Sequence, residues 1–253
     1  MSANFSPERG KIEPVTSILV IVPAYNEEAT VARVVKEVKS FFPEAEVLVV
    51  DDGSEDGTAE EALRAGAKVL RLPFNVGVGG AVQAGYLYAQ RCGYRVAVQM
   101  DGDGQHDAAD LPALLAPLLA GEADMVVGSR FLNPHSYRST PVRRLGIVLL
   151  RKLISWLSRQ HFTDPTSGFR AVGPELIRFF ARHYPYEYPE AESLLLAKRQ
   201  GFRLREVPVT MRPRQGGVSS LSGWRSLYFM AKVLLAVGVT ALRRRERVGA
   251  DGK

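Results

Sequence analysis

The sequence has little cysteine and little histidine. Cys92 is the only cysteine among the 253 residues, and there are four histidines. A disulfide scaffold is therefore excluded, a Cys-rich zinc site is excluded as well, and a histidine cluster has few residues to draw on. A single cysteine is also typical of a reducing compartment, so we expect a cytoplasmic protein.

A strong charge imbalance and an apolar targeting segment are also missing. The chain is 46% hydrophobic and 24% charged, which is the composition of a globular protein and excludes a largely disordered one. The net charge of +6 suits an anionic ligand, a membrane surface or simple solubility. The basic residues are not interleaved with aromatic ones, so we expect no nucleic acid as a partner. Residues 1–16 are polar and lack the apolar core of a signal peptide, so we expect a short leader.

Apolar runs alternate with helical patterns through the first half of the chain. Strands are predicted at 17–22, 46–50, 67–71, 95–100 and 124–128, and helices at 28–41, 56–65, 76–91 and 110–120. Strands that are apolar throughout and separated by helices predict an α/β fold with a mostly parallel sheet covered on both faces. Ligands of such sheets bind beyond the carboxyl ends of the strands, so the residues after each strand are the candidate ligands.

The first predicted strand is not followed by a glycine-rich phosphate turn. The sequence there is PAYNEE (23–28), whereas a dinucleotide-binding fold needs G-x-G-x-x-G. This argues against a dehydrogenase. The glycine-rich run NVGVGGAVQAG (75–85) follows the third strand and has a different spacing. It indicates either close packing of a helix or backbone contact with a ligand.

Acidic residues follow the second predicted strand in DDGSEDGT (51–58). Ser54 and Asp56 are residue types that favour turns and helix N-caps. Asp51 and Asp52 are adjacent at a strand end, which is costly unless one of them has a partner. A ribose hydroxyl or a base N–H is the partner we expect for Asp52.

A second acidic segment, DGDGQHD (101–107), follows the fourth predicted strand. In an extended segment the carboxylates of Asp101 and Asp103 face one side, and a bound cation relieves their repulsion. Oxygen ligands suit Mg²⁺ or Mn²⁺. A calcium EF-hand is excluded, because His106 and Pro112 stand where that loop requires Gly and Glu. The alternative is an acidic glycine turn without a metal.

Four segments in this order resemble the family 2 glycosyltransferases: ILVIVPAYNEE (18–28), VLVVDDGSEDGT (47–58), the glycine spacing of 75–85, and DGDGQHD. The resemblance covers residues 17–221. It implies the GT-A fold, a nucleotide-sugar-binding α/β domain with an Asp-x-Asp metal motif. Three later stretches are most similar to the dolichyl- or polyprenyl-phosphate sugar synthases of that family: GSRF (128–131), TDPTSGFR (163–170) and R-x-x-G-x-S, which runs from Arg214 to Ser219.

The resemblance implies a role for individual residues. Contacts to the nucleotide sugar, a UDP- or GDP-sugar, are implied for Pro23, Ala24, Tyr25, Glu27, Asp52, Asp101, Gly102 and Asp103. Coordination of Mg²⁺ or Mn²⁺ is implied for Asp101, Asp103 and Gln105. Contacts to the phosphate of a polyprenyl phosphate acceptor are implied for Arg130, Arg170, Arg214 and Ser219. Arginine suits this task because its planar fork matches phosphate oxygens. Ser220 stands where the last motif usually continues to Lys, so one expected positive charge is missing.

A catalytic base is sought in residues 188–209, which read as a helix leading into a strand. By their distance from Gly201, Glu192 matches the acid of the polyprenyl-phosphate branch, and Glu190 is closer to the base of other family 2 enzymes. Positions two apart on a helix point in different directions, so we expect one of them in the site. A phosphate acceptor is already ionised and needs no strong base, whereas a hydroxyl acceptor needs a carboxylate to take its proton. Alternatively, both acids favour a helix N-terminus. Asp164 is a further candidate, although a Thr-Asp-Pro turn also explains it.

Two apolar and basic segments predict peripheral contact with the cytoplasmic face of a membrane. Residues 222–253 are expected to form an amphipathic helix with a basic tail. The apolar stretch 226–242 has 17 residues and contains Lys232, which is too short and too polar to favour a spanning helix over one that lies on the membrane or packs in the core. The segment 138–152 is similar, with its basic residues at Arg138, Arg143, Arg144, Arg151 and Lys152.

Three classes of function remain. We favour a metal-dependent, inverting glycosyltransferase that acts on a polyprenyl phosphate, or else on a saccharide or small-molecule hydroxyl in cell-envelope synthesis. A nucleotidyltransferase usually has a glycine-rich basic loop after the first strand, which PAYNEE is not. A non-catalytic binding module is disfavoured by the intact acids Asp101, Asp103, Glu190 and Glu192.

Overall fold

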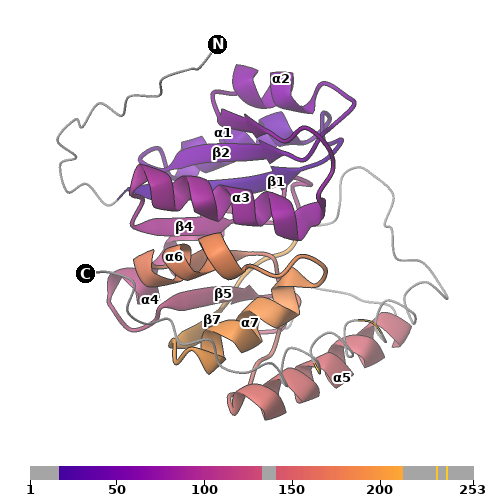
Figure 1. Ribbon diagram of the computed structural model, residues 1–253, viewed down its shortest axis with the longest axis vertical. Helices are drawn as coiled ribbons and strands as arrows, with labels where there is room; N and C mark the ends of the chain where they lie inside the picture. The colour runs from indigo at the N-terminus through magenta and orange to yellow at the C-terminus, as the bar shows by residue number, and fades with distance from the viewer. Residues whose placement is uncertain (1–16, 133–140, 213–231, 233–237, 239–253) are drawn as a thin grey trace.

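The computed structural model describes residues 17–132 and 141–212, together with the single positions Lys232 and Gly238. In this part of the chain seven strands form one sheet in the order β3-β2-β1-β4-β6-β5-β7 (Figure 1). The strands are β1 (Ile18–Ala24), β2 (Glu46–Asp51), β3 (Lys68–Arg71), β4 (Val96–Gln99), β5 (Met125–Ser129), β6 (Arg170–Val172) and β7 (Leu204–Pro208). Only β6 runs antiparallel to its neighbours, β4 and β5. The predicted α/β fold with a mostly parallel sheet is confirmed.

Helices cover both faces of the sheet. They are α1 (Val31–Phe41), α2 (Thr58–Arg64), α3 (Gly77–Cys92), the short 3₁₀ helix η1 (Ala108–Asp110), α4 (Leu111–Leu119), α5 (Pro141–Ser158), α6 (Pro174–His183) and α7 (Pro189–Arg199). In β1, Leu19 and Ile21 pack against α3, α6 and α7, whereas Val20 and Val22 pack against α1 and α4. This alternation explains why the strand is apolar at every position.

The predicted strands and helices of the first half are all present, with ends shifted by at most three residues. The elements η1, β6 and α6 were not predicted. The strand β6 is three residues long and begins with Arg170. Its length and its pattern of apolar residues do not distinguish it from a loop in the sequence. The helix α6 begins at Pro174 directly after it. The antiparallel strand is therefore a feature that the pattern of the sequence did not indicate.

Glycines of α3 allow close packing of the helix. A Cβ atom at Gly85 would lie 2.3 Å from Cγ2 of Ile21 in β1. A Cβ atom at Gly79 would lie 2.4 Å from the carbonyl oxygens of Pro185 and Tyr186. At these two positions the packing interpretation of the glycine-rich run is confirmed.

Some sequence predictions fall outside the described residues. They are the leader 1–16, Arg138, Arg214, Ser219 and, apart from Lys232 and Gly238, the tail 222–253 with its apolar stretch 226–242. Within the ranges 17–132 and 141–212, none of the helices has both the length and the apolar character needed to cross a bilayer.

Candidate functional site

The loop after β1 is joined to the loop after β2 by hydrogen bonds in both directions. The N–H groups of Asn26, Glu27 and Glu28 donate to Ser54 Oγ (3.0 Å), Thr58 Oγ1 (2.8 Å) and Asp56 Oδ2 (3.2 Å). Gly57 is the N-cap residue of α2. Asp56 nevertheless caps the helix as predicted, because its Oδ1 accepts a hydrogen bond of 3.0 Å from Thr58 N, the first N–H of α2. Ser54 does not cap the helix and instead links the two loops.

The sequence-predicted nucleotide contacts of the first loop lie at this edge of the sheet. Pro23 and Ala24 end β1, and Tyr25 follows with 45% of its surface exposed. Glu27 Oε2 accepts a hydrogen bond of 2.8 Å from Thr30 Oγ1. The Thr30 hydroxyl also lies 2.8 Å from the carbonyl oxygen of Gly102. The first loop therefore lies next to the DGDG segment.

Asp52 is buried and has partners within the protein. Its Oδ1 accepts a hydrogen bond from Val76 N (2.8 Å), and its Oδ2 accepts one from Gly77 N (2.9 Å). Val76 is the N-cap residue of α3 and has no capping side chain of its own. Asp52 thus supplies the negative charge and the acceptors that the N-terminus of α3 needs. Within the protein its partners are the N–H groups of a helix terminus, and its contact with a ligand stays a prediction.

Asp101 and Asp103 follow β4 in a turn. The prediction of an extended segment is wrong, because the chain turns at residues 102–104 and Gly104 has a φ of +73°. The Asp103 carboxylate accepts a hydrogen bond of 3.0 Å from Gln105 N. The side chain of Asp101 is 38% exposed, so it is accessible to a ligand.

His106, which the sequence analysis did not select, supports Asp101. Its Nδ1 accepts a hydrogen bond of 3.2 Å from Asp101 N, and its Nε2 lies 3.6 Å from Asp101 Oδ2. The ring stacks on Phe169 with 4.9 Å between centroids. Burial lowers the pKa of His106 to about 4, so the ring is neutral at pH 7 and carries its proton on Nε2, toward Asp101. The DGDGQHD segment contains this histidine, but the sequence does not show that its ring contacts Asp101.

The acidic turn fits a divalent cation that is shared with a phosphate ligand. Among the described residues, no group of three or more His, Cys, Asp or Glu side chains is arranged to hold a metal ion. Asp101 and Asp103 offer two carboxylates. Gln105 Nε2 donates to the Arg212 carbonyl oxygen at 3.4 Å, so its amide oxygen is the end that would ligate a cation. Mg²⁺ is commonly held by one or two carboxylates together with substrate phosphates and water, which matches this all-oxygen set.

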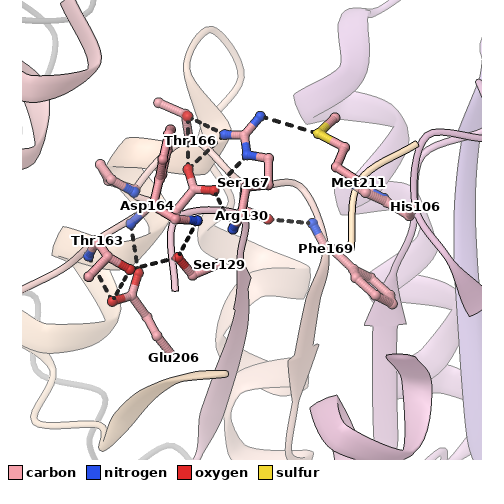
Figure 2. Close-up of polar contacts among 12 residues, drawn as sticks. His106, Ser129, Arg130, Thr163, Asp164, Thr166, Ser167, Phe169, Glu206 and Met211 are labelled. Atoms are coloured by element: carbon pink, nitrogen blue, oxygen red, sulfur yellow. Dashed lines mark hydrogen bonds and ion pairs between the residues drawn. The ribbon is translucent and has the colours of Figure 1, made fainter. Parts of the chain in front are cut away.

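The segment 163–170 brings a buried ion pair to the same edge. Arg130, directly after β5, donates from Nε to Asp164 Oδ2 (2.6 Å) and from Nη2 to Asp164 Oδ1 (2.7 Å), as Figure 2 shows. Asp164 is fully buried and is occupied by this pair, which does not suit a catalytic base. A Cβ atom at Gly168 would lie 2.9 Å from Asp101 Oδ1, so this segment packs directly against the acidic turn.

Arg170 is buried beneath the site, with 1% of its surface exposed. Its Nε donates to Ser167 O (2.7 Å), its Nη1 to Ser193 Oγ (2.6 Å) and its Nη2 to Pro165 O (3.3 Å). These bonds tie the 163–168 segment to α7. A contact from Arg170 to an acceptor phosphate therefore requires the guanidinium to leave these partners, and that role stays a prediction.

Glu190 and Glu192 both lie in the first turn of α7 and are partly buried. Burial raises the pKa of Glu190; the charge of Arg170 opposes this shift, and the charge of Asp101 adds to it. Asp101 and Glu190 are therefore close enough to interact electrostatically. Which of the two glutamates enters the site stays a prediction.

Comparison with known proteins shows the family of the chain. Residues 19–182 match the family model described as "Glycosyl transferase family 2". The chain belongs to glycosyl transferase family 2. It is 34% identical to a polyprenol monophosphomannose synthase of Mycolicibacterium smegmatis over 88% of this chain and 87% of that protein. It is 32% identical to an undecaprenyl-phosphate mannosyltransferase of Micrococcus luteus over 81% of this chain and 88% of that protein.

Similarity to solved structures confirms the GT-A architecture. Glucosyl-3-phosphoglycerate synthase of Mycobacterium tuberculosis with Mn²⁺, UDP and glucosyl-3-phosphoglycerate has a TM-score of 0.69 and 24% identity, covering 89% of this chain and 80% of that one. Its complex with Mg²⁺ and UDP has a TM-score of 0.67 and 26% identity, covering 88% and 80%. This family 2 chain is a glycosyltransferase, and its similarity to the polyprenyl-phosphate sugar synthases is confirmed.

Proposed function

We propose that this glycosyltransferase moves a sugar from a UDP- or GDP-sugar to a polyprenyl phosphate, with Mg²⁺ or Mn²⁺ bound at the acidic turn. The observation that carries the proposal is the position of Arg130. It is paired with Asp164 in the 163–170 segment, which packs against the acidic turn at Gly168. The Arg130 guanidinium and the carboxylates of the acidic turn therefore lie at the same edge of the sheet. A guanidinium binds phosphate oxygens directly, and the donor and the acceptor both carry phosphate.

The residues of the chain divide the work between donor and acceptor. The loops after β1 and β2 form the nucleoside end of the site, and Asp101 and Asp103 face the donor diphosphate. A divalent cation held there would offset the charge that develops on the departing nucleoside diphosphate. Arg130 orients the acceptor phosphate, whose oxygen attacks the anomeric carbon in a single displacement with inversion. His106 helps to hold Asp101 in place, because its Nδ1 accepts a hydrogen bond from Asp101 N.

Glu190 supports a second candidate, in which the acceptor is a hydroxyl group. Burial raises the pKa of Glu190, which makes its carboxylate a better proton acceptor than an exposed one. Glucosyl-3-phosphoglycerate synthase, the structural relative with 26% identity, is named for a non-lipid acceptor. With a phosphate acceptor Glu190 has no proton to remove, so the Glu190→Gln variant separates the two candidates.

The test is release of nucleoside diphosphate from a panel of UDP- and GDP-sugars, with Mg²⁺ or Mn²⁺, in the presence and absence of farnesyl phosphate. We expect one donor whose turnover the prenyl phosphate stimulates, and loss of that turnover with EDTA. Glu190→Gln should keep at least a tenth of the wild-type kcat with the phosphate acceptor. A loss of 10²-fold or more would instead assign Glu190 as a base. Stimulation by sugars or phosphoglycerate, but not by farnesyl phosphate, would contradict the proposed acceptor.

We also propose that α5 contacts the membrane that holds the acceptor. Leu150 and Ile154 face the core, whereas Leu149, Lys152 and Trp156 share the opposite face; Trp156 is 75% exposed. The sequence of α5 contains four basic residues and no acidic one. The helix lies at the edge of the molecule beside α7, which carries Glu190 (Figure 1). An exposed indole with basic neighbours is typical of a helix that lies in a membrane interface.

Sedimentation with vesicles tests this contact. We expect binding to vesicles that contain anionic phosphatidylglycerol and weaker binding by Trp156→Ala. Phe41→Ala removes another exposed aromatic side chain, on α1, and serves as the matched control. Equal binding by Trp156→Ala and the wild type would contradict the role of α5.

A further inference from the structure

Glu206 holds the start of the 163–167 turn. It lies on β7 beside Val127 of β5, and its side chain is partly buried. Its carboxylate accepts hydrogen bonds from Thr163 N (2.7 Å), Asp164 N (2.8 Å) and Thr163 Oγ1 (3.0 Å). Figure 2 shows these bonds converging below the turn. An ionised carboxylate only accepts hydrogen bonds, so it matches three donors, whereas a carboxamide would set an NH₂ group against at least one of them.

The same turn fixes the direction of Arg130. The backbone of Asp164 is held by Glu206, and its carboxylate accepts hydrogen bonds from Arg130 Nε, Nη2 and N, the last at 3.1 Å. Thr166 Oγ1 accepts a further hydrogen bond of 2.6 Å from Arg130 Nη2. A continuous set of bonds therefore leads from the strand β7 through the turn to the guanidinium. Since Glu206 stands on a strand of the sheet, this support is anchored in a rigid element.

The remaining nitrogen of the guanidinium is held weakly by comparison. Arg130 Nη1 donates to Met211 Sδ at 3.8 Å, and a thioether is a weak acceptor. A phosphate oxygen is a much stronger acceptor for the same nitrogen. The bonds to Asp164 and Thr166 thus fix one side of the guanidinium, and Nη1 is the nitrogen that would exchange the Met211 sulfur for a phosphate oxygen.

We propose that Glu206 is a positioning residue for the acceptor: it fixes the 163–167 turn so that Asp164 aims Arg130 at the acceptor phosphate. This inference rests on the proposed function. It assigns the preference for a phosphate acceptor in part to a strand residue that does not touch Arg130 itself. Loss of the Glu206 charge should therefore weaken acceptor binding without weakening donor binding, because the donor loops after β1, β2 and β4 make no contact with Glu206 in the described hydrogen bonds.

The experiment compares steady-state kinetics of the wild type and Glu206→Gln, with farnesyl phosphate as the acceptor and the most active nucleotide sugar as the donor. We expect the KM for farnesyl phosphate to rise about tenfold, which corresponds to about 1.4 kcal/mol and to the loss of one hydrogen bond to a charged group. The KM for the donor should stay within about twofold. Arg205→Gln, the exposed neighbour on β7 that pairs with Glu122, is the matched control and should change neither constant.

A second variant keeps the test decisive if Glu206→Gln does not fold. Thr163→Val removes one donor to Glu206 and leaves both backbone bonds, so a smaller rise of the acceptor KM, about threefold, is expected. An unchanged acceptor KM in every folded variant, or an equal change of donor and acceptor KM, would overturn the positioning role. A wild type that shows no transfer to farnesyl phosphate would instead overturn the proposed function on which this inference rests.

Discussion

The cap that Asp52 provides for α3 leads to a quantitative prediction for Asp52→Ala. The variant removes the acceptors of two N–H groups at the N-terminus of the helix. Gly77 N keeps a second acceptor, Asn75 Oδ1 at 3.0 Å, so the loss falls mainly on Val76 N. Losing a hydrogen bond to a charged acceptor costs about 1.5–3 kcal/mol, and losing an N-cap costs about 0.5–2 kcal/mol. Both figures describe the same contact and are not added. We therefore expect the free energy of unfolding to fall by about 2 kcal/mol.

Urea unfolding followed by circular dichroism measures this free energy. Thermal unfolding should show a fall of Tm by about 4–8 °C, since 1 kcal/mol corresponds to about 2–4 °C in a domain of this size. Asp52→Asn keeps one acceptor for Val76 N and should lose less. The control is Glu55→Ala, an exposed residue of the same loop, which should stay within about 0.5 kcal/mol of the wild type. Equal stability of Asp52→Ala and Glu55→Ala would refute the capping role.

Three further predictions concern packing, charge and pH. Gly79→Ala should unfold at a lower urea concentration than Gly85→Ala, because the new methyl group meets backbone oxygens at position 79 and a side chain at position 85. Overpacking lowers the free energy of unfolding by about 1–3 kcal/mol. The reverse order of urea midpoints would contradict this reasoning. Asp164→Ala leaves Arg130 buried without its counter-charge, so the free energy of unfolding in the same assay should fall by about 3–5 kcal/mol. A fall of less than about 1 kcal/mol would show that water reaches the pair. The raised pKa of Glu190 means that the folded state binds this proton more tightly than the unfolded state, so wild-type stability falls as pH rises above the usual Glu range near pH 4. Glu190→Gln should therefore be more stable than the wild type at pH 8 and lose this advantage toward pH 4; a pH-independent difference would contradict the shift.

The sheet could be predicted from the sequence because its central strands contain unbroken apolar runs. These runs are residues 18–24, 47–50 and 96–98. The rule that ligands bind beyond the carboxyl ends of parallel strands then selected the acidic turn. Asp101 and the 163–170 segment do meet there, through Gly168.

The partners of the buried charges could not be predicted, because they are distant in the sequence. Asp52 is bonded to N–H groups 24 and 25 residues away, and Asp164 is bonded to Arg130 at a separation of 34 residues. A local pattern shows the charge but not the group that neutralises it. Arg170 illustrates the same point. It closely follows the sequence Pro-Thr-Ser-Gly, which is typical of a turn, whereas the antiparallel strand β6 places it in the interior.

The central claim is that the acidic turn after β4 supports cation-dependent transfer of a sugar to a prenyl phosphate. The most direct measurement is mass spectrometry of the product formed from farnesyl phosphate and the active nucleotide sugar, with the wild type and with Asp103→Asn. The account predicts a glycosyl phosphoprenol product from the wild type with Mg²⁺ or Mn²⁺, and a loss of that product by at least 10²-fold both with EDTA and in Asp103→Asn. Full product formation by Asp103→Asn, or a sugar product that contains no phosphate, would contradict it.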